Sequence, residues 1–195
     1  MTSKALQAFD HAIQDADDLL HHFDSLNTNP PPPQIEVLKR ASLVMALAAL
    51  EIYFEDRLLE AAKALSAEPY TEHKLATFFS ESLANDLKYF HTPSTDRVRP
   101  IFKKYLGFDV TEGWNWNQCD SGMAKKKLNS LTKLRGDIAH RSRRPLSGES
   151  QPSPHVVNAG VKARLFAATL FTPKRALCPL PFCPSPHLPK TQPGH

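Results

Sequence analysis

The sequence predicts an all-α fold, an antiparallel bundle of about five to six helices followed by a proline-rich C-terminal tail. Apolar residues recur at spacings of three and four along several long stretches, which is typical of helices with one buried face. The alternation of apolar and polar residues that is typical of strands is scarce, and the 195 residues include only 7 Gly. A chain with 41% hydrophobic and 23% charged residues has the ordinary composition of a globular protein.

The first helix is expected over residues 4–26. Its apolar stripe runs through Leu6, Phe9, Ile13, Ala16, Leu20 and Phe23, and aspartates occupy the opposite side. The prolines of residues 30–33 then end it and form an extended spacer. His21 and His22 are either metal ligands or solvated side chains; the second interpretation is preferred, because no third ligand recurs at helical spacing.

The second helix is expected over residues 34–65, which contain no Gly or Pro. Residues 43–50 are apolar all round, which predicts a helix surrounded by others. Glu51 ends this run and lies either at an exposed edge or against a buried cation. A buried carboxylate must be paired, and Arg135 is the candidate partner.

Shorter helices are expected over residues 70–90 and 94–106. Ser94 is placed to cap the second of these, and Gly107 to end it, although Pro100 leaves open a start one turn later. Residues 108–122 read as a loop. Its Trp114 and Trp116 either stack on nucleic-acid bases or anchor the loop to the core, which is the commoner use of such residues.

The next helix is expected to begin near Asp120 or Ser121 and to end at His140. Its apolar positions Leu128, Leu131, Leu134 and Ile138 recur at threes and fours. Ser153-Pro154 predicts the start of a last helix that continues to residue 171. From Thr172 the last 24 residues contain 7 Pro and no apolar periodicity. We therefore expect a helical domain over residues 1–171 and a disordered tail over residues 172–195.

Charge is distributed unevenly along the chain. Residues 1–90 hold 7 Lys/Arg and 14 Asp/Glu, whereas residues 91–195 hold 17 and 6. One face is therefore expected to meet a polyanion. The three cysteines form neither a disulfide framework nor zinc-type spacing. With no signal-peptide segment and no apolar run long enough to span a bilayer, a cytoplasmic protein without a membrane partner is expected.

Arg135 and His140 are the residues with the clearest chemical potential. A guanidinium can hold phosphate oxygens in a bidentate fork, and an imidazole can give or take a proton near neutral pH. Together they suit acid–base cleavage of a phosphodiester, with no metal or other cofactor. Residues 121–150 hold 8 Lys/Arg and 2 acids, enough to attract RNA. In the alternative interpretation, the lysines are a solvated helix face, Arg135 pairs with a core Glu, and His140 caps a helix end.

The segment from Leu131 to His140 resembles the Arg-x4–6-His motif of HEPN-domain proteins, specifically the RiboL-PSP-HEPN branch. Residues 40–55, whose apolar run ends in Leu50-Glu51, are similar to the long central helix of that branch. The family usually has a polar residue directly after the Arg, whereas this chain has Gly136 followed by Asp137. The similarity covers roughly residues 4–171.

The resemblance implies a helical bundle that forms a homodimer and, in many members, a metal-independent endoribonuclease of toxin–antitoxin or antiphage systems. Arg135 would hold the scissile phosphate and His140 would act as general acid or base, with Glu51 and Asp137 in support. The RNA would be guided by Lys133, Arg141, Arg143 and Arg144. A dimer would bring two copies of the pair into one cleft, and a nucleotidyltransferase-like antitoxin is a possible partner. The alternatives are a catalytically inactive dimer that binds RNA or nucleotides or acts as a scaffold, and a nucleotide-binding domain that serves a partner enzyme.

Overall fold

The fold of this chain is all-α, as the sequence predicts. The computed structural model describes residues 3–30, 32, 34–66, 73–116 and 119–140. Its elements are α1 (Lys4–Leu26), α2 (Glu36–Ser66), α3 (His73–Leu87), α4 (Thr95–Leu106), the short 3-10 helix η1 (Val110–Gly113) and α5 (Ser121–His140). Within these described ranges the extended structure is limited to one isolated bridge between Trp116 and Cys119.

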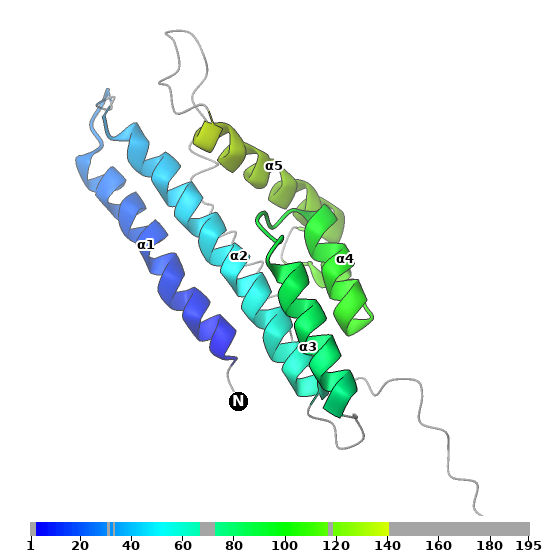
Figure 1. Cartoon of the computed structure of the whole chain (residues 1–195). Coiled ribbons are helices and arrows are strands. Elements are labelled where there is room, and N and C mark those ends of the chain that lie inside the picture. The colour runs from blue at the N-terminus through cyan, green and yellow to red at the C-terminus, as the bar shows by residue number, and fades with distance from the viewer. Residues whose placement is uncertain (1–2, 31, 33, 67–72, 117–118, 141–195) are drawn as a thin grey trace, which may run out of the picture.

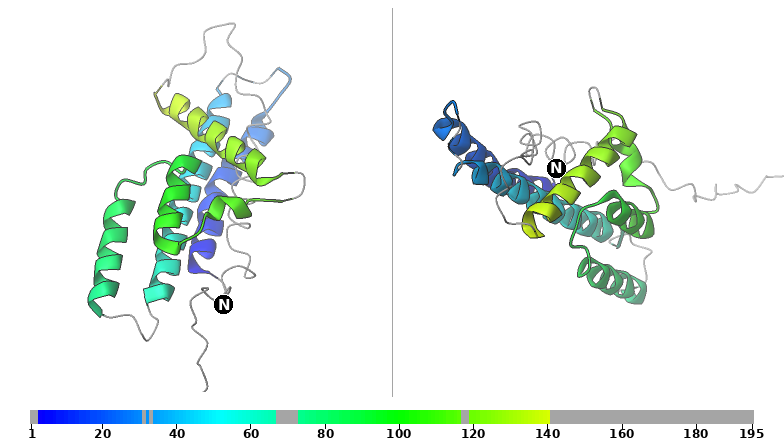
Figure 2. Two further views of the ribbon diagram at one scale, coloured as in Figure 1. Left: turned by 90° about the vertical axis from the view of Figure 1, so that its right-hand side faces the viewer. Right: turned by 90° about the horizontal axis from the view of Figure 1, so that it is seen from above.

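Helix α2 is the centre of the bundle. It packs against α1, α3, α4 and α5. Figure 1 shows α1 lying along one side of α2, while α3, α4 and α5 lie on the other side. In the two views of Figure 2, α5 crosses α2 obliquely near the end of the bundle where α2 begins. Helix α2 is therefore the one element against which α1, α3, α4 and α5 all pack.

The α1–α2 pair shows how the apolar stripes meet. Phe9 and Ile13 of α1 are buried in the same core as Leu50 and Tyr53 of α2, and the rings of Phe9 and Tyr53 lie 5.2 Å apart between centroids. The pair also contains a buried polar contact, because the Ser42 hydroxyl donates a 2.7 Å hydrogen bond to the carbonyl of Ala16. A satisfied buried hydroxyl of this kind keeps the two helices in register.

The interpretation of residues 43–50 as enclosed on all sides is wrong for one side of α2. Met45, Ile52 and Leu59, which are seven residues apart, form an exposed stripe, and Ile52 retains 53% of its accessible surface. Seven residues make almost two full turns, so the three side chains share one face. Among the described residues, none covers this face.

Helix α4 begins where the sequence indicates, but the cap comes from another helix. Ser94 occupies the N-cap position without a side-chain cap bond. Instead, the Asn129 Oδ1 atom of α5 accepts the backbone N–H of Thr95 at 2.9 Å, and its Nδ2 donates to the Thr95 hydroxyl at 2.7 Å. The helix continues through Pro100, so the later start is not used. Gly107 ends it with a left-handed φ of 78°, as expected of a C-terminal glycine.

The connection between α4 and α5 is anchored by Trp114, which is fully buried and packs near Phe54 of α2 with 6.0 Å between ring centroids. Trp114 is therefore a core residue, and base stacking is excluded for it. Trp116 packs partly against the same core. Helix α5 starts at Ser121, and Asp120 caps it by accepting the N–H of Met123 at 2.7 Å.

Several predictions fall outside the described residues: the helix over residues 153–171, the tail over residues 172–195, and with them the domain boundary at residue 171. Of the helices that are described, none has the length and apolar character needed to cross a membrane.

The Asn129 cap generates a stability prediction. Asn129→Ala leaves the N–H of Thr95, a buried residue at the start of α4, without its acceptor. We expect a loss of about 1–2 kcal/mol in the free energy of unfolding, measured by urea denaturation. Asn129→Asp keeps the acceptor oxygen and should lose less, and Ser130→Ala, at the exposed neighbouring position, should lose little. Equal stability of Asn129→Ala and the wild type would contradict the cap.

Candidate functional site

Arg135 lies where α5 crosses α2, and its partner is Glu51, as the sequence analysis proposed for a buried Glu51. The Arg135 Nη2 and Glu51 Oε2 atoms are 3.9 Å apart, and the two side chains retain 31% and 17% of their accessible surface. Leu128 and Leu131 bury the same side of α5, and Leu134 and Ile138 pack partly against the core beside them. The apolar stripe of α5 thus sets the helix rotation that turns Arg135 toward α2.

The Arg135–Glu51 contact is an ion pair without a hydrogen bond. The Oε2 atom of Glu51 is buried and has no hydrogen-bond partner, and within the described part of the chain the Arg135 guanidinium makes no hydrogen bond either. Burial raises the pKa of Glu51, while the positive charges of Arg135 and His91 act in the opposite direction. Among the described residues, Arg135 is therefore paired by charge alone, and none of them accepts its N–H donors.

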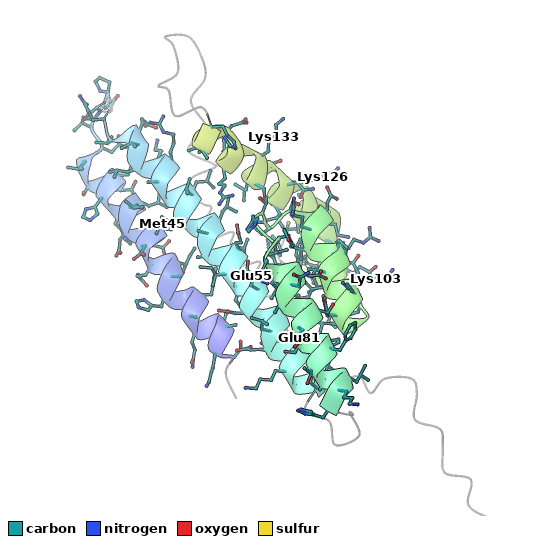
Figure 3. All side chains as sticks on the ribbon, in the orientation of Figure 1. Met45, Glu55, Glu81, Lys103, Lys126 and Lys133 are labelled. Atoms are coloured by element: carbon teal, nitrogen blue, oxygen red, sulfur yellow. The ribbon has the colours of Figure 1, made fainter. Side chains whose placement is uncertain are left out.

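A second carboxyl group extends this acidic part of α2. Burial, together with the neighbouring charges of Glu51 and Asp56, raises the pKa of Glu55 to about 6. Glu55 follows Ile52 by three residues, so it borders the exposed apolar stripe. Figure 3 labels Glu55 and Met45 on α2. The middle of α2 thus combines an apolar face with carboxylates that are partly removed from water.

His140 is the last residue of α5 and is exposed. The helix is continuous from Arg135 to His140, and five residues of regular helix separate two side chains by about 140° around the axis and about 7.5 Å along it. Arg135 faces α2, so His140 points in a different direction. The structure does not bring the two side chains of the motif together within one chain.

His140 belongs instead to the outer face of α5. Lys126, Lys133 and His140 are seven residues apart and therefore lie in one row along the helix, and all three are exposed. Figure 3 shows Lys126 and Lys133 on the outer side of α5, away from α1. The other expected RNA contacts, Arg141, Arg143 and Arg144, lie outside the described residues.

The two residues that follow Arg135 differ in their surroundings. A Cβ atom built on Gly136 would meet nothing within 4 Å, so the absence of a side chain there is not required by packing. Asp137 is half-buried on α5. The departure from the usual polar residue after the Arg is therefore a difference in chemistry and not in fold.

His91 is a site residue that the sequence analysis missed. It is exposed in the connection between α3 and α4, and its charge acts on the carboxyl of Glu51. No spacing relates His91 to Arg135, which is 44 positions away, so only the fold could place them near the same carboxylate. Among the described residues, no group of three or more His, Cys, Asp and Glu side chains is arranged to hold a metal ion.

Comparison with known proteins identifies the family. A family model described as RiboL-PSP-HEPN matches residues 10–158, which is most of the chain. The match includes both segments that carry the resemblance, the central helix around Glu51 and the Arg135–His140 motif. No curated protein and no solved structure gives a significant match.

The Arg135–Glu51 pair generates a prediction of coupled stability. Arg135→Met leaves the partly buried Glu51 carboxylate without its nearest cation, and we expect a loss of about 1–2 kcal/mol in unfolding free energy at pH 7.5. Adding Glu51→Gln should recover most of it, and the loss should shrink toward pH 4.5, where Glu51 binds a proton. Lys133→Met, at an exposed position of the same helix, is the control and should change stability by less than about 0.5 kcal/mol. If the double variant is no more stable than Arg135→Met, the two side chains are not coupled.

Glu55 generates a pH prediction. The pKa of Glu55 is about 6 in the fold, above the ordinary value of 4.5, so the folded state binds the extra proton. The contribution of Glu55 to stability is therefore fully present below about pH 4.5 and is lost as the pH rises through 6. Glu55→Gln should melt at a higher temperature than the wild type at pH 7.5, and the difference should disappear by pH 4.5. Glu81→Gln, at an exposed position of α3, should show no such trend.

Proposed function

We propose, from the premise that this chain belongs to the RiboL-PSP-HEPN family, that the protein is a metal-independent endoribonuclease that acts as a homodimer. The observation that carries the proposal is the arrangement on α5. Arg135 has a guanidinium that donates no hydrogen bond to any described residue, and His140 has an exposed imidazole at the end of a row of lysines.

The proposed reaction needs no group beyond these side chains and the RNA itself. A neutral imidazole takes the proton of the ribose 2′-hydroxyl, and the 2′-oxygen attacks the adjacent phosphorus. The bond from phosphorus to the 5′-oxygen breaks, and an imidazolium donates a proton to that oxygen. Arg135 stabilises the negative charge on the phosphorane oxygens. The products are a 2′,3′-cyclic phosphate and a 5′-hydroxyl.

The separation of Arg135 and His140 around α5 supports a site made from two chains. Side chains about 140° apart on one helix do not reach the same phosphate together. A two-fold axis near the end of α5 would bring His140 of each chain toward Arg135 of the other. The dimer is thus integral to the catalytic proposal, because an isolated chain would hold an incomplete site.

The biological setting we propose follows the family. Metal-independent RNA cleavage by a small helical protein suits a toxin of a toxin–antitoxin pair or an antiphage effector in the cytoplasm, with a nucleotidyltransferase-like antitoxin as the partner. Lys126 and Lys133 would attract the RNA backbone along the outer face of α5, and this contribution would weaken with salt.

The alternative is a catalytically inactive dimer that binds RNA or nucleotides, or that acts as a scaffold. One observation favours it: Gly136 stands directly after Arg135, where the family usually has a polar residue. In this case the basic face of α5 would bind RNA without cleaving it.

The test is an RNA cleavage assay with the full-length protein in excess EDTA. We expect cleavage to 2′,3′-cyclic phosphate ends, no cleavage of RNA with 2′-O-methyl groups, and a loss of about 100-fold or more in kcat/KM for His140→Ala. His22→Ala, at an exposed position of α1, is the matched control and should cleave normally.

Sedimentation of each protein completes the test. The His140→Ala variant should remain a dimer. Its loss of cleavage then results from the missing imidazole and not from a failure to assemble. Equal cleavage by His140→Ala and the wild type would overturn the role of His140. Tight RNA binding without cleavage by the wild type would support the binding module.

A further inference from the structure

His91 is an imidazole whose charge, like that of Arg135, acts on the carboxyl of Glu51. The connection from α3 to α4 that carries it joins the upper ends of these two helices, on the side of α2 where α5 also lies (Figure 1). His91 is exposed at this place, while the residues around it are anchored. His91 is therefore held at the surface, and its charge acts on the Glu51 carboxyl that pairs with Arg135.

The connection is fixed on both sides of His91. Phe90 precedes it with only 4% of its surface exposed, and Pro93 follows it fully buried. The carbonyl of Tyr89 accepts a 2.8 Å hydrogen bond from Arg97, which ties the start of the connection to α4. A short segment with both flanks buried or bonded keeps the side chain between them in a narrow range of positions.

The connection is also tied to α5 itself. Asn129 binds both the backbone N–H and the hydroxyl of Thr95, four residues after His91. Asn129 is six residues before Arg135, which is about 9 Å along the helix axis and about 120° around it. Helix α5 thus holds Arg135 and fixes the end of the connection that carries His91. The effect of the His91 charge on the pKa of Glu51 agrees with this placement.

We propose that His91 is a second catalytic imidazole, which works beside Arg135 of its own chain, while His140 reaches the same phosphate from the partner chain. The inference rests on the proposed function and deepens it. Each site then holds one Arg135, one His91 and one His140, so each of the two proton transfers has its own imidazole. One imidazole takes the 2′-hydroxyl proton, and the other gives a proton to the 5′-oxygen.

Single variants give the first test, in RNA cleavage with EDTA. His91→Ala should lower kcat/KM by about 100-fold, as a lost acid or base does, while leaving the dimer and the melting temperature unchanged. Free imidazole at millimolar concentration should restore some of the activity of His91→Ala and leave the wild type unaffected. If the role of His91 were merely structural, free imidazole would not restore the cleavage activity of His91→Ala. His22→Ala is again the control.

Heterodimers give the sharper test. Two differently tagged chains, one His91→Ala and the other His140→Ala, are co-expressed and purified through both tags. In the proposed two-chain arrangement, one of the two sites of this heterodimer keeps both His91 and His140, and the other site lacks both. About half of the wild-type activity is therefore expected. The control pairs a wild-type chain with a chain carrying both substitutions, and it should be inactive because each of its sites lacks one imidazole.

Failure of this inference is distinguishable from failure of the proposed function. Cleavage that is lost in His140→Ala but normal in His91→Ala overturns the role of His91 alone. Loss in both variants with an inactive mixed heterodimer overturns the two-chain arrangement. A wild-type protein that cleaves no RNA overturns both proposals.

Discussion

The structure depends on a carboxylate that is partly withdrawn from water at the centre of its central helix. Glu51 follows the apolar run of α2, the helix against which α1, α3, α4 and α5 all pack. Burial of the carboxylate carries a free-energy cost that is offset only where a cation approaches, and Arg135 of α5 is that cation. The pair therefore links the packing of α5 to the position of the guanidinium on which the proposed chemistry depends.

The same ion pair explains how one residue can serve both the fold and a ligand. A bidentate, hydrogen-bonded pair would occupy the donors of Arg135, whereas the 3.9 Å contact with Glu51 takes up none of them. Asn129 has a comparable dual role nearer the start of α5, because it caps α4 and so fixes the connection that carries His91. The proposed site is thus supported by contacts that also hold the bundle together.

Membership of the RiboL-PSP-HEPN family describes the fold and the motif, and the arrangement of the motif on α5 gives the functional proposal its specific form. Arg135 faces the core helix and His140 faces outward, so the two side chains of the motif do not meet within one chain. The exposed stripe of Met45, Ile52 and Leu59 on α2 is separate from the motif on α5. It is bordered by Glu55, whose carboxyl has a raised pKa.

The sequence by itself determined the all-α class, the five described helices to within a few residues and the Gly107 stop, because helical periodicity and end signals are local. It offered Arg135 only as the candidate partner of a buried Glu51, and the packing of α5 on α2 decided that the two side chains meet. The tertiary structure decided what depends on packing between distant segments. Trp114 proved to be core, one side of α2 proved to be exposed, and the cap of α4 came from α5 and not from Ser94. His91 could not be found from spacing, since its relation to Glu51 arises only when α3, α4 and α5 pack on α2.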